Sequence, residues 1–230
     1  MKRAILFDFD GTLAYMQPSH KKLYEQAINE HNKLPRAFSV NEINVQDAWI
    51  NWTTDEGIEH LQYSNSETDY NKLRKKIHIH RLNALEVKEN IEIISDRIIE
   101  LESNTNFYIL YEDTIEILSI LLQNNIKMGI VSNHLWNLKD ITKSLGLNKY
   151  FNSIISSAQI GYRKPHPAIY KAALSEINAS PEDVLFIGDN LESDYLGPKN
   201  VGLSAVLLDR NGKNQMSESI KSLNELSKML

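Results

Sequence analysis

The chain has 230 residues, of which 42% are hydrophobic and 24% charged, and its formal net charge is -5 at pH 7. Such values are ordinary for a soluble globular protein with one large or two small domains. The absence of cysteine excludes disulfides, thiolate metal sites and a cysteine nucleophile. Basic residues cluster only at Lys72–Lys76, and no apolar run approaches the ~20 residues that cross a bilayer. We therefore expect a cytoplasmic protein that binds neither nucleic acid nor membrane.

The first predicted element is a buried strand that ends in two carboxylates. Residues Ala4–Phe7 form a short apolar run, which is typical of a strand covered on both faces in a parallel sheet. Asp8 and Asp10 follow two positions apart, and Gly11 comes next. Side chains alternate along a strand, so both carboxylates point the same way if the chain stays extended. On its own, the segment is equally consistent with a strand that ends in an Asp-Gly turn.

Residues 15–106 carry helical patterns and no convincing strand. Ser19 is suited to cap a helix that continues to Glu30. Further helices are predicted over Asn41–Trp52, Asp55–Leu61, Asp69–Leu82 and Leu85–Leu101. This block has the size of a small domain. We therefore predict an all-helical domain at 15–106, inserted into a core made of residues 1–14 and 107–230.

From Tyr108 onward, apolar runs alternate with amphipathic stretches, as in a doubly wound parallel sheet. The predicted strands are Ile126–Val131, Ser153–Ser156, Val184–Ile187 and Ala205–Leu208. The predicted helices are Asp113–Gln123, Leu135–Leu145, Pro167–Ile177, Gly197–Gly202 and Leu223–Leu230. The predicted fold class is α/β, a Rossmann-like doubly wound parallel sheet with an inserted all-helical domain.

Three later segments place polar groups close to predicted strand or helix ends. Ser132 and Asn133 follow the strand at 126–131, Lys164 precedes a proline-bracketed turn, and Asp189 follows the strand at 184–187, with Asp194 five residues later. Taken singly, each has a common structural explanation: a helix cap, a solvated lysine, or a turn. Their joint order favours a functional site, because parallel α/β sheets bind ligands at the carboxyl ends of their strands.

The ordered set of motifs resembles the haloacid dehalogenase-like (HAD) superfamily. That family carries Asp-x-Asp-Gly-Thr, then a Ser or Thr, then a Lys, then Gly-Asp-x-x-x-x-Asp, and this chain has residues 8–12, Ser132, Lys164 and residues 188–194 in the same order. The match covers the whole chain. The resemblance implies that 15–106 is a helical cap that closes over the active site, with hinges near 13–18 and 103–111.

The acid pair is suited to phosphoryl transfer. Asp8 can act as the nucleophile and form an aspartyl-phosphate, while Asp10 can protonate the leaving group and then deprotonate water. The resemblance assigns these same roles. Because Asp8 and phosphate are both anionic, a divalent cation is needed, and Mg²⁺ prefers oxygen ligands. We predict that Asp8, Asp189 and the Asp10 backbone carbonyl hold Mg²⁺, and that Asp194 lies behind them and holds Lys164 or a metal-bound water.

The remaining motif residues are predicted to bind the phosphate. Ser132 can donate its hydroxyl to a phosphate oxygen, and backbone amides at Asn133 face the site if a helix begins there. Thr12 adds a similar contact after the first strand. Lys164 supplies positive charge to the nucleophile and the phosphate in the transition state, which makes it a predicted catalytic residue as well as a phosphate ligand.

The predicted function is Mg²⁺-dependent hydrolysis of a small phosphorylated metabolite through an aspartyl-phosphate. A phosphomutase would use the same core. A dehalogenase is disfavoured because, in the resembled family, those enzymes lack the second aspartate that Asp10 supplies here. A phosphonate hydrolase would need a cap lysine that forms a Schiff base, and a phospho-ligand sensor without turnover would not need Asp10. The sequence leaves the substrate and the oligomeric state open.

Several residues near the motifs are left without a role. His134, Arg163 and Asn190 border the motifs, and Glu192 is a weaker metal candidate than Asp189. His78 and His80 diverge on a helix because they are two positions apart. Trp49 and Trp52 have helical spacing and are interpreted as packing residues of the cap.

Overall fold

The computed structural model describes residues 3–32, 38–40, 59–212 and 219–228. Its main sheet has six parallel strands in the order β5-β4-β1-β6-β7-β8. These strands are β1 (Ala4–Phe7), β4 (Lys127–Ser132), β5 (Ser153–Ser156), β6 (Val184–Gly188), β7 (Ser204–Leu208) and β8 (Ser219–Ile220). From β1 the chain builds β4 and β5 on one side, and then returns to build β6 to β8 on the other. The doubly wound α/β class is therefore confirmed.

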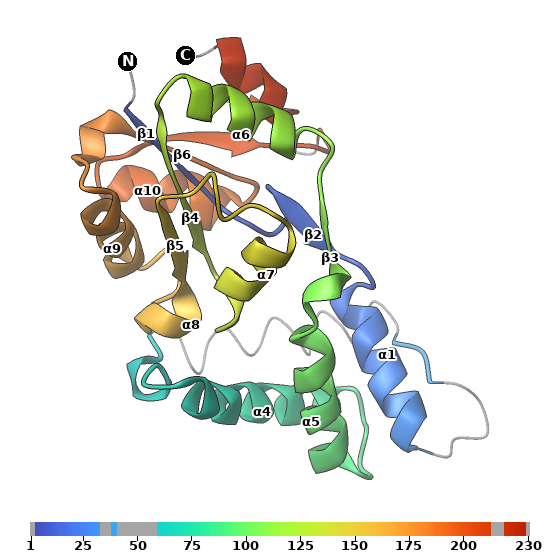
Figure 1. Ribbon diagram of the computed structural model, residues 1–230. Coiled ribbons are helices and arrows are strands. Elements are labelled where there is room, and N and C mark those ends of the chain that lie inside the picture. Colours follow the sequence, from blue (N-terminus) through green and yellow to red (C-terminus); the bar gives the residue numbers. More distant parts are fainter. Residues whose placement is uncertain (1–2, 33–37, 41–58, 213–218, 229–230) are drawn as a thin grey trace.

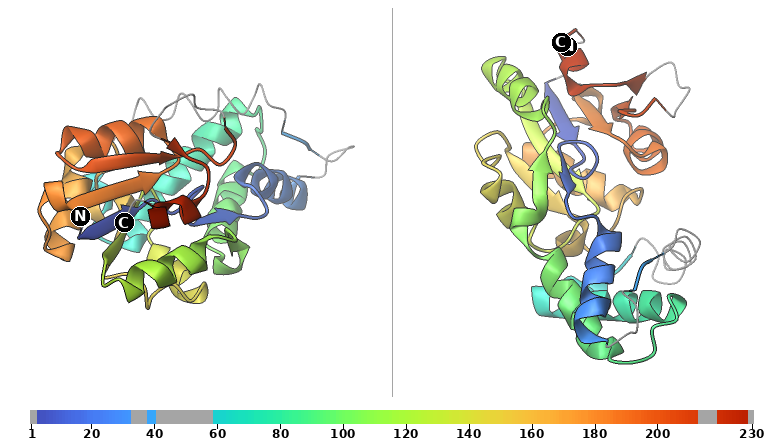
Figure 2. Two further views of the ribbon diagram at one scale, coloured as in Figure 1. Left: turned by 90° about the horizontal axis from the view of Figure 1, so that it is seen from above. Right: turned by 90° about the vertical axis from the view of Figure 1, so that its right-hand side faces the viewer.

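The central strand β1 is buried on both faces, as its apolar sequence predicts. Ile5 and Phe7 point into one apolar layer with helix α6 (Thr114–Gln123) and helix α7 (Leu138–Ser144). Ala4 and Leu6 point into the opposite layer, which contains α9 (Pro167–Ile177) and the short α10 (Gly197–Asn200). This alternation makes the sheet the middle of a three-layer sandwich, visible in Figures 1 and 2.

Three helices gather at one end of the sheet, beyond the carboxyl ends of β1 and β4 (Figure 1). They are α1 (His20–His31), α4 (Glu67–Ala84) and α5 (Ile91–Glu102). Their apolar faces form a separate cluster that includes Leu23, Ile28 and Ile94. A smaller cluster, built around Tyr70, Leu73 and Ala158, joins α4 to the short helix α8 (Ser157–Ile160) of the sheet domain. The helical block thus has a core of its own and rests on the sheet domain through a few contacts.

The structure corrects several boundaries of the helical block. The helix predicted over Leu85–Leu101 begins only at Ile91, because Glu86 and Asn90 have positive φ values of 61° and 56° that break a right-handed helix. The helix predicted over Asn41–Trp52 lies outside the described residues, as do Trp49 and Trp52. Of Asp55–Leu61, only the last three residues are described, and they hold an isolated bridge from Glu59 to Tyr162 and the start of a 3₁₀ turn, Leu61–Tyr63.

Two short strands at the ends of the helical block were not predicted. β2 (Ala14–Met16) and β3 (Tyr108–Leu110) pair in antiparallel fashion, so the chain leaves and re-enters the sheet domain along one ribbon. Three residues are too few to give a readable alternating pattern, and β2 overlaps the predicted start of the block at residue 15. Short 3₁₀ turns occur at Thr105–Phe107, Pro181–Asp183 and Leu223–Lys228, the last where an α-helix was predicted.

Candidate active site

The predicted nucleophile Asp8 lies at the carboxyl end of the central strand. The Asp8 backbone N–H donates to the Ile187 carbonyl at 2.8 Å, which continues the β1–β6 pairing. The strands are in register, so the ends of β1, β4 and β6 bring Asp8, Ser132 and Asp189 to the same edge of the sheet. This edge lies where the chain reverses its direction of growth across the sheet, which is where doubly wound folds bind ligands.

Lys164 is buried between two carboxylates at this edge. Its Nζ lies 2.8 Å from Asp8 Oδ1 and donates to Asp194 Oδ1 at 2.6 Å. Burial alone would lower the pKa of Lys164, but the charges of Asp194 and Asp8 outweigh it and raise that pKa above its ordinary value. The ammonium therefore stays protonated and presents a fixed positive charge beside the Asp8 carboxylate.

Asn133 holds the backbone of Lys164 in place. Its side-chain Oδ1 accepts from the Lys164 N–H at 2.7 Å, and its Nδ2 donates to the Lys164 carbonyl at 2.9 Å. This two-point contact ties the loop before α9 to the end of β4. The Asn133 side chain is thus engaged in positioning the lysine, and the predicted phosphate contact falls to its backbone N–H.

Asp8, Asp189 and Asp194 converge into one acidic cluster, in which one oxygen of each lies within 4.8 Å of the others. Asp189 follows β6, and Asp194 lies on a π-helical turn, Leu191–Leu196. Such turns are rare and are frequent at functional sites. Glycine permits the close approach on one side, because a Cβ added at Gly11, whose φ is +75°, would lie 2.2 Å from Asp189 Oδ2.

The carboxylates of the acidic cluster repel one another. Desolvation and the charges of Asp8 and Asp194 raise the pKa of Asp189 to about 7, although this residue is exposed at the rim of the site. Burial and the charge of Asp8 likewise raise the pKa of Asp194 to about 6, against the opposing effect of Lys164. Three carboxylates held this close, with a single ammonium between two of them, match the oxygen ligands and the charge demand of a divalent cation. The residues present therefore fit Mg²⁺.

Asp10 points away from the acidic cluster and towards a pocket beside His134. The Asp10 side chain is 48% exposed, and its Oδ2 lies 3.5 Å from His134 Nε2. Desolvation within the site raises the pKa of the Asp10 carboxyl. The interaction with His134 opposes this rise, and the charge of Asp8 adds to it. A raised pKa suits a group that must give up a proton and then take one back.

His134 is oriented by its own backbone. Its Nδ1 accepts from the Leu135 N–H at 2.8 Å, so in the neutral ring the proton is on Nε2, which faces Asp10. Burial lowers the pKa of His134 in spite of the attraction of Asp10, which keeps the ring neutral near pH 7. The sequence assigned this residue no role. Its position two residues after Ser132 could have indicated that it lies at the carboxyl end of the same strand.

Ser132 and Thr12 complete the set of predicted phosphate ligands. Both are buried, with exposed fractions of 2% and 0%. Within the described ranges the Thr12 hydroxyl makes no hydrogen bond, and none is formed by the Ser132 hydroxyl. A buried hydroxyl without a partner, such as that of Thr12, is costly. Both hydroxyls have donor capacity left for an anion at this edge.

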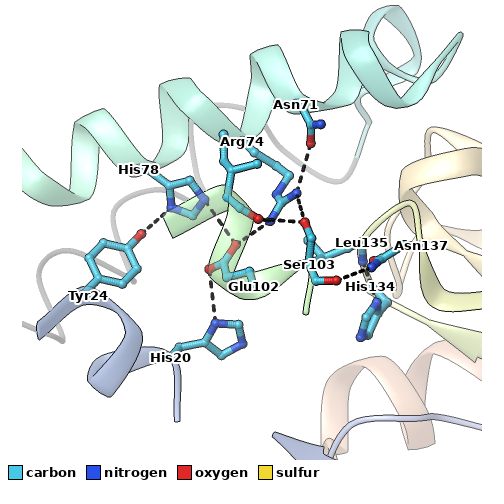
Figure 3. A network of polar contacts seen from close by, with 11 residues as sticks. His20, Tyr24, Asn71, Arg74, His78, Glu102, Ser103, His134, Leu135 and Asn137 are labelled. Carbon is cyan, nitrogen blue, oxygen red and sulfur yellow. Dashed lines mark hydrogen bonds and ion pairs between the residues drawn. The ribbon is translucent and has the colours of Figure 1, made fainter. Parts of the chain in front are cut away.

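A pocket of about 210 Å³ opens beyond Asp10, between the sheet domain and the three helices. Its wall on the helical side is anchored by Glu102, which contacts three basic side chains (Figure 3). Glu102 accepts from Arg74 Nη2 at 3.0 Å and lies 3.2 Å from both His78 Nε2 and His20 Nδ1. The Asn137 amide of the sheet domain donates to the Ser103 carbonyl at 3.0 Å, which fixes this wall to the sheet domain.

The family model of haloacid dehalogenase-like hydrolases matches residues 2–202. The chain belongs to this family. The match confirms the resemblance drawn from the motifs. The relatives include a glyceraldehyde 3-phosphate phosphatase from Methanothermobacter thermautotrophicus, 27% identical over 91% of this chain and 86% of that protein. They also include the pyrophosphatase PpaX from Oceanobacillus iheyensis, 27% identical over 89% of this chain and 83% of that protein.

Solved structures of this hydrolase family share the fold. The hydrolase YfnB from Bacillus subtilis, bound to magnesium, superposes with a TM-score of 0.75 at 22% identity, over 100% of this chain and 98% of that one. A 2-haloacid dehalogenase from Pseudomonas syringae gives a TM-score of 0.68 at 19% identity, over 99% and 97% of the two chains. Enzymes with different chemistries thus share this architecture, so the fold by itself does not select the reaction.

No helix in the described part of this hydrolase is both long and apolar enough to cross a membrane.

Proposed function

We propose that the protein is a Mg²⁺-dependent phosphatase that hydrolyses a small phosphomonoester through a phosphorylated Asp8. The observation that carries the proposal is the separation of the two acids of the first motif. Asp8 is buried against Lys164 and the acidic cluster, whereas Asp10 faces the pocket where a leaving group would lie. One carboxylate is thus placed for attack and the other for proton transfer.

In the first step, an Asp8 oxygen attacks phosphorus, the bond from phosphorus to the ester oxygen breaks, and Asp10 gives its proton to the departing alkoxide. In the second step, the ionised Asp10 takes a proton from water as that water attacks the phosphorus of the aspartyl-phosphate. Inorganic phosphate leaves and Asp8 is restored. Lys164 stabilises negative charge on the phosphoryl oxygens in both steps, and the hydroxyls of Ser132 and Thr12 are donors for the same oxygens.

Asp8 and Asp189, with the Asp10 backbone carbonyl, are the proposed protein ligands of Mg²⁺. When bound, the cation would neutralise the phosphoryl oxygens and the acidic cluster. Asp194 acts only as a hydrogen-bond acceptor when it is ionised. It accepts from the Asn190 N–H at 3.0 Å and from Lys164. Asp194 therefore serves to hold Lys164, and it stands close enough to the cluster to accept from a metal-bound water.

Two observations favour a phosphatase over its relatives in the family. Asp10 is present and faces the pocket, which supports acid–base catalysis on an alkoxide leaving group rather than dehalogenation. Among the described residues that line the pocket there is no lysine, so a Schiff base of the phosphonate hydrolase type has no support. Relatives named as phosphatases of glyceraldehyde 3-phosphate and pyrophosphate support a small phosphorylated substrate.

We propose that the chain is divided into a catalytic core and a cap. Residues 1–14 and 107–230 form the catalytic core, and 15–106 form the cap that supplies the far wall of the pocket. The separate apolar cluster of α1, α4 and α5 and the antiparallel ribbon β2–β3 support this division.

The deciding experiment measures phosphate release from a panel of phosphorylated metabolites and p-nitrophenyl phosphate, with Mg²⁺ and after chelation. We expect turnover only with Mg²⁺, and none in Asp8→Asn, which keeps the shape of the side chain but removes the nucleophile. A fluoroberyllate adduct on wild-type Asp8 provides the matching structural readout. Undiminished turnover in chelator, or in Asp8→Asn, would overturn the mechanism; transfer of the phosphoryl group to a second hydroxyl of the substrate would identify a mutase instead.

A further inference from the structure

The turn that follows the acid pair is held by an arginine from the far end of the chain. Arg210 lies two residues after β7, and its Nη2 donates to the Thr12 carbonyl at 2.8 Å, across a separation of 198 residues. Its guanidinium also donates to the Asp113 carboxylate, from Nη1 to Oδ2 at 3.0 Å and from Nη2 to Oδ1 at 2.9 Å. One side chain thus joins the first motif to the residue that precedes α6.

The partner carboxylate, Asp113, is itself fixed by the segment that follows β8. Its Oδ2 accepts from the Ser222 hydroxyl at 2.8 Å and from the Leu223 N–H at 2.9 Å. Burial would raise the pKa of Asp113, but its hydrogen bonds, first of all those from Arg210, lower that pKa below its ordinary value. The carboxylate therefore stays ionised near neutral pH and gives the guanidinium a fixed partner of opposite charge.

The guanidinium is also packed against an aromatic ring beside the β2–β3 ribbon. The Arg210 Cζ lies 3.9 Å from the centroid of the Tyr111 ring, and that ring contacts the Tyr15 ring of β2, with 5.1 Å between the two centroids. A cation over the face of an aromatic ring is attracted to it. Arg210 is therefore held in one plane, in which its N–H groups reach Asp113 and Thr12.

Three groups of the candidate site belong to the turn that Arg210 holds. The Asp10 carboxyl faces the pocket, the Asp10 carbonyl is a proposed Mg²⁺ ligand, and the Thr12 hydroxyl is a proposed donor to the phosphate. The carbonyl that accepts from Arg210 belongs to the same residue as that hydroxyl. A shift of the turn would therefore move all three groups at once, and a misplacement of about 1 Å can cost roughly 10²-fold in rate.

Contacts from outside fix where the turn lies, because its own hydrogen bonds only close it on itself. Within the turn, the Leu13 N–H donates to the Phe9 carbonyl at 2.9 Å. From outside, the Thr114 hydroxyl donates to the Leu13 carbonyl at 2.8 Å, and Arg210 donates to the Thr12 carbonyl. Two consecutive carbonyls are thus held, one by α6 and one by the loop after β7.

We propose that Arg210 is a positioning residue of the proposed phosphatase: together with Asp113 it anchors the turn after the acid pair, so that Asp10 reaches the leaving group and Thr12 reaches the phosphate. The inference rests on the proposed function and adds to it a residue that does not line the pocket at Asp10. Arginine suits this task because its planar fork donates two parallel hydrogen bonds to a carboxylate and a further one to a carbonyl. A lysine has a single nitrogen and cannot reproduce these directions.

The kinetic test asks whether Arg210 acts through Asp10. In Arg210→Ala, we expect kcat for the best alkyl phosphate of the panel to fall roughly 10–100-fold, the effect of losing a hydrogen bond to a charged group. The loss for p-nitrophenyl phosphate should be smaller, because its leaving group needs the Asp10 proton less. A residue that only stabilised the fold would lower both rates equally, through the fraction of folded enzyme.

Chemical rescue gives a second kinetic readout. The Arg210 side chain is 17% exposed, so free guanidinium can reach the space that Arg210→Ala leaves. Millimolar guanidinium should restore part of the alkyl phosphate rate, whereas methylammonium should not, because it lacks the planar fork. For the same reason Arg210→Lys should be nearly as slow as Arg210→Ala. Full activity of the lysine variant would contradict the proposed geometry.

Hydrogen exchange tests the anchor without turnover. In Arg210→Ala and Asp113→Asn, the amides of Leu13 and Ala14, which donate within the turn, should exchange faster than in wild type by roughly tenfold or more. The amides of α5 should keep their wild-type rates. Asp113→Asn removes the charge and keeps the shape, so it decides the question if Arg210→Ala does not fold.

Arg97→Ala is the matched control, because Arg97 also forms two hydrogen bonds with one carboxylate, that of Glu30, and does not line the pocket. We expect it to leave the exchange of the turn and the ratio of the two rates unchanged. Wild-type exchange of the turn in both anchor variants, an equal loss with the two esters, or the same effects in Arg97→Ala would overturn the inference.

Failure of the inference and failure of the function are separable. If wild type hydrolyses phosphate esters but the anchor variants lose both rates equally, Arg210 only stabilises the fold and the phosphatase stands. If wild type hydrolyses no ester while the amides of the turn exchange faster in both anchor variants, the anchor stands and the proposed function is wrong.

Discussion

His134 Nε2 faces the Asp10 carboxylate at 3.5 Å, while His134 Nδ1 accepts the backbone N–H of Leu135. The backbone thus fixes the ring so that its remaining N–H is directed at the proposed acid–base group. A neutral N–H donor stabilises the ionised form of Asp10 without adding a full positive charge. That assists the second step, in which Asp10 must be a carboxylate.

Replacing His134 should therefore change the pH dependence of turnover. In His134→Phe, loss of the N–H donor should raise the pKa of Asp10 further, so the acidic limb of the kcat profile should move to higher pH. Because the contact is long, at 3.5 Å, we expect kcat near pH 7 to fall by roughly 2–10-fold, which corresponds to about 0.5–1.5 kcal/mol. His31→Phe, at the end of α1, is the control. An unchanged limb in His134→Phe would show that the ring acts only by packing against Phe9 and Tyr108.

Asp10→Asn should slow turnover by about 10²–10⁴-fold, the usual loss for a general acid–base group. The loss should be greatest for alkyl phosphates, whose leaving groups need the proton, and smaller for p-nitrophenyl phosphate. Steady-state kinetics with both kinds of ester provide the measurement. Equal losses for the two would mean that Asp10 is needed for structure, for instance through the Asp10–Ala14 bridge in the turn before β2.

The acidic cluster predicts how stability depends on pH. The pKa values of Asp189 and Asp194 are raised from 3.8 to about 7 and about 6. For acids with a raised pKa in the folded state, the stabilisation is complete below the unfolded pKa and is lost as pH rises through the folded one. The metal-free protein should therefore lose stability between about pH 4 and pH 7 relative to Asp189→Asn.

Mg²⁺ should reverse that loss, because it binds the ionised carboxylates and competes with protons. We expect the rise in melting temperature caused by Mg²⁺ to grow across the same interval in wild type and to be small in Asp189→Asn. Thermal unfolding with and without Mg²⁺ at several pH values measures both effects. A Mg²⁺ effect that is the same at pH 5 and pH 8 would contradict the proposed ligands.

Glu102→Gln should destabilise the protein severely. The substitution leaves the buried Arg74 without its counter-ion, and breaking one side of a buried pair costs about 3–5 kcal/mol. At about 2–4 °C per kcal/mol for a chain of this size, the melting temperature should fall by roughly 6–20 °C. Glu100→Gln removes an exposed partner of Arg97 one turn away and should change stability by less than about 1 kcal/mol. Similar losses in both variants would contradict the role of the buried network.

The sheet and the motif residues could be predicted because each leaves a local pattern. Apolar runs marked β1, β4 and β6 within one residue of their observed ends, and the polar residues after them marked the edge where the candidate site lies. The pocket could not be predicted, because it depends on contacts over long separations. Glu102 meets His20 across 82 residues and Arg74 across 28, and no local spacing indicates such a meeting.

The same distinction explains what was missed near the motifs. Asn133 was predicted to contact the phosphate through its backbone amide, and that stays a prediction. The contact of its side chain with the backbone of Lys164, 31 residues away, was not predicted. Arg163 carried no signal of its own, because an arginine beside a lysine is ordinary on a protein surface. Its place in the lining of the pocket depends on the packing of the helical block against the sheet domain.

The central place of β1 in the sheet has a consequence for the order in which the protein assembles. Its neighbours β4 and β6 begin at residues 127 and 184, so β1 has no partner in the sheet until more than half of these 230 residues have been made. Translation at about 5–20 residues per second separates Asp8 from Asp194 by roughly 10–40 s. In the later part of that interval the helices between β2 and β3 can already pack on one another, whereas Asp8, the proposed nucleophile, still lacks its contact with Lys164. The proposed active site is thus completed only after the helical block has been made.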